Sequence, residues 1–261
     1  MPSLADPCKL SDGRCFVSTA LVHYTAAAVS DRGRKRTSNE DAFAISVEHG
    51  VFLVCDGMGG AAAGEIASSL AVDEVLRMLT SRAEAVPLVK AAQEAVLTAN
   101  EAILSRSQHD QNLNGMGTTL VGLLVEERCV LVLNIGDSRC YRMRNGKLEQ
   151  LTEDHSFVDE QVRLGYMTRE QALRSNFRSM ITRALGTQSQ VQPDLFQLEA
   201  EPGDLFLLCS DGLTRELSDS VIESLLAVDL PLEGLCASLV SAANKAGGHD
   251  NITCVLVRAE L

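Results

Sequence analysis

Four aspartates in this sequence lie where an apolar run meets a tight polar turn. They are Asp56 after residues 51–55, Asp137 after residues 130–136, Asp211 after residues 205–210, and Asp250 before residues 252–257. Such runs predict buried strands, so each carboxylate would be half desolvated and would need a cation, a donor or a metal beside it. Hard divalent cations are the natural partners where several carboxylates converge. The sequence therefore predicts a metal centre built from distant aspartates.

Glycine directly follows two of these aspartates, in Asp56-Gly57 and Asp211-Gly212. A glycine lets the backbone approach closely, so a peptide carbonyl could join carboxylate oxygens around one ion. The alternative is that Asp-Gly serves only as turn chemistry. We favour the metal interpretation because a helical pattern, rather than a partner strand, follows each pair.

A strongly charged segment, residues 30–41, separates the first two expected strands. It carries four basic and three acidic side chains in twelve residues. The segment is either a solvated loop or a binding site for an anion, since arginine side chains bind phosphate and carboxylate groups.

Hydrophobic periodicity predicts the elements that would position these residues. The expected strands cover residues 24–29, 42–47, 51–55, 118–125, 128–135, 139–144, 195–198, 205–209 and 252–258, and the expected helices cover residues 64–78, 86–108, 218–228 and 232–246. Tight turns at Glu126-Glu127 and Asn145-Gly146 indicate one antiparallel sheet over residues 118–144, beneath the first two helices. Residues 153–186 are polar, with two short helical patterns, and look like an insertion over the sheet. This order of elements predicts an α+β fold of two packed sheets flanked by helix pairs.

Length and composition narrow the possible classes of protein. With 261 residues, of which 46% are hydrophobic, the chain can bury a large core; we expect an N-terminal arm, residues 1–22, and one domain, residues 23–261. The net charge of −12 disfavours nucleic acid and anionic membranes as partners. No apolar run reaches the length of a membrane-spanning helix, and the first residues lack the pattern of a secretory signal. We expect a cytoplasmic protein that is a monomer.

Seven motifs occur along the chain. They are Ser30-Asp31-x-Gly33 through Arg36-x-x-Asn39-Glu40-Asp41, Asp56-Gly57-Met58-Gly59-Gly60, Gly115-Met116-Gly117-Thr118-Thr119, Gly136-Asp137-Ser138-Arg139, Leu151-Thr152-x-Asp154-His155-Ser156, Ser210-Asp211-Gly212 and Asp250-Asn251-Ile252-Thr253. In this order they resemble the metal-dependent Ser/Thr protein phosphatases of the PPM group, type 2C, and especially their compact bacterial branch. The resemblance implies a four-layer α-β-β-α sandwich of two mostly antiparallel sheets, a flap over about residues 153–186, and a centre of two Mn²⁺ or Mg²⁺ ions.

The same resemblance implies the metal ligands. Asp56 would bridge both ions, Asp211 and Asp250 would complete the protein ligands of one ion, and the Gly57 carbonyl would serve the other. Ions about 3.5–4 Å apart lower the pKa of a shared water, so that a bridging hydroxide attacks phosphorus in line. No protein nucleophile and no covalent phosphoenzyme are expected.

Further roles follow from the resemblance around this centre. Glu40 and Asp137 would hold metal-bound waters, and Arg36 would bind the substrate phosphate, a role that suits a planar donor fork better than a lysine. Relatives with a third ion tend to carry Asp where Asn112 stands, so a third site here would depend on Asp110.

The expected activity is hydrolysis of phosphoserine and phosphothreonine in phosphorylated protein substrates, in opposition to a cognate Ser/Thr kinase. Two alternatives stay open at this point. The first is a phosphoprotein-binding regulator of the same fold without turnover, and the second is a two-metal hydrolase of small phosphoesters.

Two weaker signals point to other chemistry. Cys209 lies six residues before Arg215, the spacing of cysteine-based phosphatases, but Asp211 in the intervening loop would repel phosphate. The pattern Gly57-x-Gly59-x-x-Ala62 resembles a dinucleotide fingerprint, but no acidic strand end follows it about twenty residues later. We interpret Cys209 as a buried strand residue.

Overall fold

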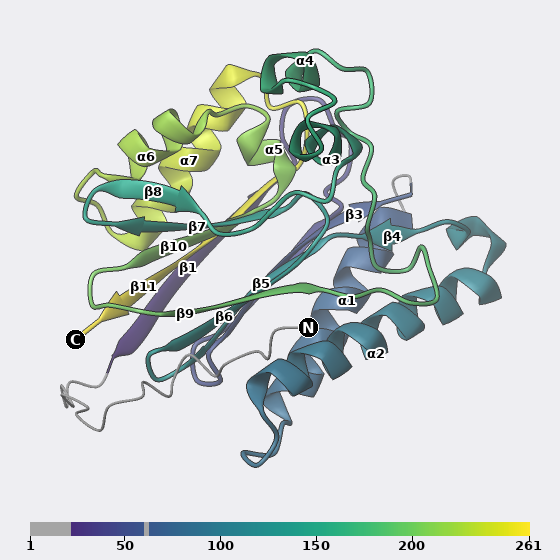
Figure 1. Ribbon diagram of the computed structural model, residues 1–261, viewed down its shortest axis with the longest axis horizontal. Helices are drawn as coiled ribbons and strands as arrows, with labels where there is room; N and C mark the ends of the chain where they lie inside the picture. Colours follow the sequence, from purple (N-terminus) through teal and green to yellow (C-terminus); the bar gives the residue numbers. More distant parts are fainter. Residues whose placement is uncertain (1–21, 60–62) are drawn as a thin grey trace.

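The computed structural model describes residues 22–59 and 63–261, and in them two antiparallel β-sheets pack face to face (Figure 1). The first sheet has the order β1-β11-β10-β7-β8, with bounds His23–Asp31, Ile252–Glu260, Leu205–Cys209, Arg139–Arg144 and Lys147–Gln150. The second has the order β2-β3-β5-β6-β9, with bounds Asp41–Ser46, Val51–Met58, Leu120–Glu126, Cys129–Ile135 and Asp194–Glu199, and the short β4 (Gly117–Thr118) pairs with β3. The expected N-terminal arm, except Val22, lies outside the described residues, as do Gly60 and Ala62 of the glycine-containing motifs.

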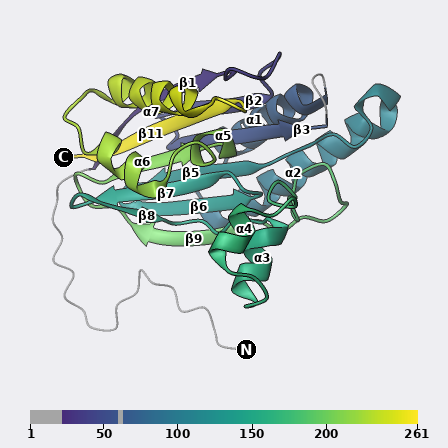
Figure 2. The same cartoon turned by 90° about the horizontal axis from the view of Figure 1, so that it is seen from above.

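Helices cover the outer face of each sheet. On the second sheet lie α1 (Ala63–Thr80) and α2 (Leu88–His109), which the 3-10 turn η1 (Gln111–Leu113) follows. On the first sheet lie α6 (Asp219–Leu226) and α7 (Leu232–Ala246), preceded by the short α5 (Asp211–Thr214). Figure 2 shows the same layers from above. The predicted α+β fold, a four-layer α-β-β-α sandwich, is confirmed.

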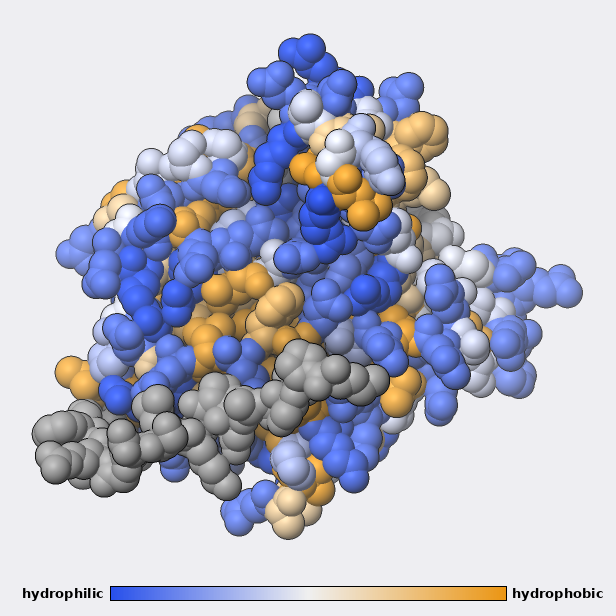
Figure 3. Space-filling view, viewed as in Figure 1, coloured by the Kyte–Doolittle hydropathy of each residue, from blue (hydrophilic) through white to orange (hydrophobic). Residues whose placement is uncertain are grey.

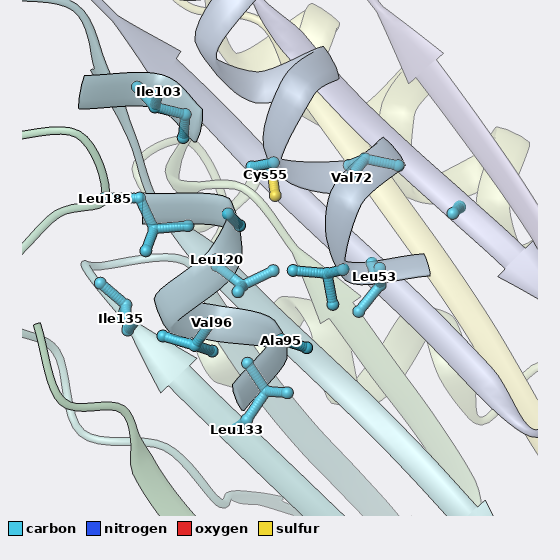
Figure 4. Close-up of a cluster of buried hydrophobic side chains, with 14 of the residues drawn as sticks. Leu53, Cys55, Val72, Ala95, Val96, Ile103, Leu120, Leu133, Ile135 and Leu185 are labelled. Atoms are coloured by element: carbon cyan, nitrogen blue, oxygen red, sulfur yellow. The ribbon is translucent and has the colours of Figure 1, made fainter. Parts of the chain in front are cut away.

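The strands alternate their side chains between two cores, and this alternation places the first aspartate. In β3, Leu53 and Cys55 pack beneath α1 and α2 (Figure 4), whereas Phe52 and Val54 fill the space between the sheets. Successive strand residues point to opposite faces, so Asp56 shares the face of Phe52 and Val54. Its carboxylate therefore lies at the end of the layer between the two sheets.

Two details of the sheets differ from the sequence-based expectation. Strand β7 belongs to the first sheet, not to the sheet beneath α1 and α2, because residues 136–138 carry the chain from one sheet to the other. Strand β3 continues to Met58, so Asp56 lies within the strand and not after it. The expected hairpin turn at Asn145-Gly146 is confirmed, and both residues have the positive φ, 53° and 76°, that a tight type I′ turn requires.

The expected insertion, residues 153–186, contains two short helices, α3 (Phe157–Arg163) and α4 (Arg169–Leu173), and we call it the flap. Figure 1 shows these helices beyond the ends of the strands, near α5. In the described part of the chain, the helices lack the combination of length and apolarity needed to cross a membrane.

Candidate metal centre and its clefts

Aspartates from both sheets meet at one end of the layer between them. Asp41 on β2 pairs in register with Asp56 on β3. From the first sheet, the Ser210 hydroxyl donates to Asp41 Oδ2 at 2.8 Å, and the charge of Asp211, at the start of α5, is near enough to raise the pKa of Asp56. The two sheets therefore bring together acidic residues that are far apart in the sequence.

The segment around β4 fixes the backbone of Asp56. The Asp56 amide donates to Thr119 Oγ1 at 2.9 Å, while the Asp56 carbonyl accepts from the Thr119 amide and from Thr118 Oγ1, both at 2.9 Å. The Gly115–Thr119 motif thus holds Asp56 in place through hydrogen bonds to its backbone.

Both Asp-Gly pairs need glycine because another backbone packs against them. A Cβ at Gly57 would overlap the Gly64 carbonyl, and a Cβ at Gly212 would overlap the Asn251 carbonyl. Neither glycine has a positive φ. Close backbone approach, and not turn conformation, therefore explains these two glycines.

The charged segment at residues 30–41 folds against the residues around Asp250. The Asn251 side chain accepts from the Glu40 amide at 2.9 Å and donates to the carbonyls of Arg32 and Ser38 at 3.0 and 2.8 Å. Arg36 Nη2 donates to Asp250 Oδ2 at 2.8 Å, and 48% of the Arg36 side chain is exposed. The segment is therefore an ordered loop that presents an arginine at the acidic cluster.

Burial and mutual repulsion raise the pKa values of the clustered carboxyl groups. The pKa of Asp56 is raised well above its usual value, first by burial and then by the charges of Asp41 and Asp211. Burial also raises the pKa of Asp137 to about 8 and that of Asp41 to about 7, and it raises the pKa of Glu40. Near neutral pH, such a cluster must hold either protons or cations.

Arg215, at the end of α5, is the second guanidinium at the cluster. It forms an ion pair with Asp211, and it lies 3.6 Å from Asp137 Oδ2 and 3.6 Å from Asp250 Oδ2. Even so, the buried Oδ1 atoms of Asp41, Asp137 and Asp211 have no hydrogen-bond partner among the residues that the structure describes. The cluster therefore keeps acceptor oxygens that the protein itself does not satisfy.

The donor set fits hard divalent cations. Carboxylate and backbone carbonyl oxygens are the ligands that Mg²⁺ and similar ions prefer, and the unpartnered carboxylate oxygens are free to bind them. Within residues 22–59 and 63–261, no three acidic, histidine or cysteine side chains already form a closed metal cage; the Arg215 guanidinium stands among the acids. An ion bound there would compete with Arg215 for Asp211.

Two adjoining clefts open onto the cluster. The smaller, of about 290 Å³, is lined by Arg36, Glu40, Asp56, Gly57, Met58, Gly59, Ser179, Ile181, Asp211, Arg215 and Asp250. The larger, of about 590 Å³, includes Asp137 and lies between the flap and the segment from Asp211 to Glu216. Both share Ser179 of the flap together with Asp211, Arg215 and Asp250. All the residues expected around two ions therefore line one or both clefts.

The residues expected near a third ion lie elsewhere. Asp110 ends α2 and caps η1, because its Oδ1 accepts from the Asn112 amide at 3.0 Å and from Asn112 Nδ2 at 3.1 Å. Neither residue lines either cleft. A third metal site stays a prediction.

The cysteine and dinucleotide interpretations do not fit the structure. Cys209 is fully buried in β10, and burial raises the pKa of its thiol to about 12, so it would not supply a thiolate. Among the described strands, the partners of β3, which carries Gly57, are β2, β4 and β5, and all three are antiparallel to it, whereas a dinucleotide site needs a parallel βαβ unit.

Sequence reasoning missed the contributions of three residues. In the sequence, Arg215 attracts notice through its spacing from Cys209, although its position four residues after Asp211 in a helix also predicts a side-chain contact with Asp211. Asp41 and Asn251 belong to motifs that do not by themselves indicate a role for either residue. Their contacts join segments more than 150 residues apart, which no local pattern reveals.

Comparison with known proteins identifies the family of proteins that share this fold and site. The sequence profile of the protein phosphatase 2C family matches residues 31–256. The chain belongs to this family.

Individual relatives are bacterial phosphatases. The chain is 38% identical to the serine/threonine phosphatase stp of Listeria monocytogenes over 242 residues, which cover 89% of this chain and 94% of that one. It is 40% identical to the serine/threonine protein phosphatase PstP of Mycobacterium tuberculosis over 238 residues, 91% of this chain but 45% of that longer protein.

Solved structures of such proteins share the fold. The crystal structure of M. tuberculosis PstP superposes with a TM-score of 0.86 at 37% identity, covering 92% of this chain and 100% of that one. A structure of the PstP catalytic domain in complex with two manganese ions has a TM-score of 0.84 at 36% identity, with 93% and 100% of the two chains covered. A two-metal Mn²⁺ or Mg²⁺ active site follows for this chain as a member of the family.

Proposed function

We propose that this protein is a metal-dependent protein phosphatase that removes phosphate from phosphoserine and phosphothreonine in proteins, in opposition to a Ser/Thr kinase. The observation that carries the proposal is the cluster of buried aspartates with raised pKa values and unpartnered oxygens beside Arg36. Family membership and the names of the relatives agree with it. A cytoplasmic location and a monomeric state stay predictions.

Asp56, Asp211, Asp250 and the Gly57 carbonyl are the proposed ligands of the two ions. When bound, the ions supply a nucleophile by lowering the pKa of water, and they neutralise charge on the phosphoryl oxygens. The raised pKa values of the carboxyl groups are consistent with this role, since a cation replaces protons in such a cluster.

The remaining residues of the site position substrate and water. Arg36 has its guanidinium in the smaller cleft and is half exposed, so its fork can turn from Asp250 to a substrate phosphate. Glu40 is buried and lines the same cleft, where its carboxylate can orient water. Asp137 can do the same from the larger cleft through its unpartnered Oδ1.

The experiment is phosphate release from a phosphothreonine peptide with and without Mn²⁺. We expect release that requires Mn²⁺, stops with a chelator, and is lost in Asp211→Asn. Activity that survives chelation but is abolished by thiol alkylation would contradict the proposal and indicate a cysteine-based mechanism at Cys209.

Two further measurements separate the alternatives. Faster turnover of nucleotides or sugar phosphates than of phosphopeptides would identify a small-molecule hydrolase. Binding of phosphopeptides without turnover in saturating Mn²⁺ would identify a silent regulator. The full set of aspartate ligands disfavours the regulator, because a protein that only binds phosphoproteins has no need of a cage for two ions.

A further inference from the structure

The larger cleft extends the proposed active site toward the flap. Its one wall comes from the flap, including Ser156, Asp159, Arg169 and Arg178, and its other wall comes from the body of the protein around α5. Its volume, about 590 Å³, is about twice that of the smaller cleft, which holds Arg36 and Asp56. A substrate whose phosphate lies in the smaller cleft therefore has room for neighbouring residues in the larger one.

Four arginines line the larger cleft, and two of them already have acidic partners. Arg139 donates to Asp154 from Nε at 2.9 Å and from Nη2 at 2.7 Å, and Arg215 is held by the acidic cluster. Arg169 and Arg178 are different, because the structure gives their side chains no hydrogen bond or ion pair with any described residue. These two flap guanidiniums are therefore free to bind an anion.

Two other flap arginines already have acidic partners. Arg163 pairs with Glu153, and Arg183 Nη1 donates to Asp194 Oδ1 at 2.6 Å. The whole chain has a net charge of −12, which repels acidic ligands at long range. The cleft itself is lined by six acidic residues and four arginines, so its two unpaired arginines would offset this repulsion only locally, on the flap wall.

The stretch from Phe177 to Met180 connects the two clefts. Ser179 lines both of them, and Arg178 beside it lines the larger. The flanking Phe177 and Met180 are 58% and 52% exposed, so apolar surface is available beside the arginine. Figure 3 shows apolar side chains among strongly hydrophilic ones over the flap. A polypeptide that passes Ser179 from the smaller to the larger cleft would therefore meet Arg178.

We propose that Arg169 and Arg178 form a subsite for a second anionic group of the substrate, near the phosphorylated residue. The proposal rests on the proposed function and names a substrate class: phosphoproteins that carry an acidic side chain or a second phosphate close to the phosphate that is removed. Guanidinium groups bind carboxylate and phosphate oxygens through paired N–H donors, so both groups fit the same chemistry.

The test compares phosphothreonine peptides that differ at one position at a time. The neighbouring residue is alanine, glutamate or a second phosphothreonine, and kcat and KM for phosphate release are measured in Mn²⁺ at low salt. The enzymes are the wild type, Arg169→Gln/Arg178→Gln, and Arg174→Gln as a matched control. Arg174 is an exposed flap arginine without a described partner, and it lines neither cleft.

For the wild type, we expect kcat/KM about fivefold to tenfold higher for the anionic peptides at the best position, as two partly exposed ion pairs allow. The preference should arise in KM and shrink at high salt. The double variant should lose it while hydrolysing the alanine peptide and p-nitrophenyl phosphate normally, and Arg174→Gln should keep it. A preference for the second phosphate alone would support the subsite with phosphate as its ligand, and an equal preference for glutamate would support it for carboxylates as well.

Any one of three results would overturn the subsite alone. The wild type could hydrolyse the alanine peptide normally and show no preference for anionic peptides. The double variant could keep the preference, or Arg174→Gln could lose it to the same extent as the double variant. If the wild type hydrolyses none of the peptides in Mn²⁺, the proposed function is overturned, and the subsite with it.

Discussion

Strand β10 carries an aspartate beyond each of its ends, and the two aspartates have opposite surroundings. Asp204, directly before the strand, is 1% exposed and is fully paired. Arg144 donates to its Oδ1 from Nε and to its Oδ2 from Nη2, both at 2.6 Å, and the Glu201 amide donates to Oδ2 at 2.8 Å. This end of the strand neutralises its buried charge within the protein.

The other end of β10 leaves its charge incompletely neutralised. Asp211 lies beside Asp56 and Asp250, and burial raises its pKa. Within residues 22–59 and 63–261, its Oδ1 has no hydrogen-bond partner. Its cation, Arg215, is shared with Asp137 and Asp250. A buried aspartate at a strand end is thus not functional in itself. What distinguishes Asp211, the proposed metal ligand, is the lack of a dedicated partner, which leaves it able to bind an external cation.

The largest expected effect is a loss of activity when Asp211, but not Asp204, is replaced. Asp211→Asn should lower kcat/KM for a phosphothreonine peptide by more than about 100-fold, since even the loss of an outer partner of a metal ligand costs about 10- to 100-fold. The free energy of unfolding of the metal-free variant should change little, because the substitution also removes repulsion within the cluster. Phosphate-release kinetics and urea unfolding measure both quantities. A stable variant with full activity would contradict the comparison.

The converse substitution should affect stability instead. Asp204→Asn removes one partner of a buried ion pair and should lower the free energy of unfolding by about 3 kcal/mol. Activity per folded molecule should stay near that of the wild type, because Asp204 lies at the far end of the strand. Asp229→Asn, which removes an exposed aspartate, is the matched control for the change in net charge. Equal stability of the two variants would show that the Arg144 pair is unimportant.

Replacing Arg215 tests whether its guanidinium competes with metal ions for the acidic cluster. Arg215→Gln should bind Mn²⁺ about two- to fivefold more tightly, because the guanidinium no longer competes for Asp211 and its neighbours, and a partly exposed ion pair contributes only about 0.2–1 kcal/mol. Titration calorimetry of the metal-free protein measures this, with Arg174→Gln as the control. Weaker binding in Arg215→Gln would mean that Arg215 supports the metal site and does not compete with the ion.

The smallest effect concerns His155, a buried base held in its neutral form. Its Nδ1 accepts from the Gly136 amide at 3.0 Å, and burial lowers its pKa. The unfolded chain, with the ordinary histidine pKa of about 6.5, therefore binds a proton more readily than the folded protein. Stability that depends on neutral His155 is complete above about pH 6.5 and is lost as the pH falls below it.

The measurement for His155 compares unfolding at pH 7.5 and pH 5.5. The wild type should lose more stability between these pH values than His155→Gln does, and subtracting the two cancels the titration of the carboxyl groups. An identical pH dependence in both proteins would show that the folded state tolerates a charged His155.

The sequence predicted the elements well because most strands and helices carry a clear apolar period. Its error on β7 arose because residues 136–138 form a link of three residues that can either close a hairpin or cross between sheets. Only packing decides between these two. The alternation in β3 shows how a local pattern can place a proposed metal ligand, since the face of Phe52 and Val54 determines where Asp56 points.

The residue types of the candidate site could be predicted from the sequence. How its acidic residues and Arg215 pair could not. Asp56, Asp211 and Asp250 stood out because each is acidic beside an apolar run. The competing role of Arg215 could not be predicted, because it depends on three acids contributed by separate segments. The capping role of Asp110 was equally hidden, since the same residue types serve as metal ligands and as helix caps.

The most direct test of the two-cation centre is a crystal structure of the wild type grown in Mn²⁺, with anomalous diffraction measured at the manganese edge. The account predicts two anomalous peaks that both contact Asp56, with Asp211 and Asp250 on one of them and the Arg215 guanidinium displaced from Asp211. Peaks located away from these three aspartates, or an Arg215–Asp211 ion pair that persists in saturating Mn²⁺, would contradict it.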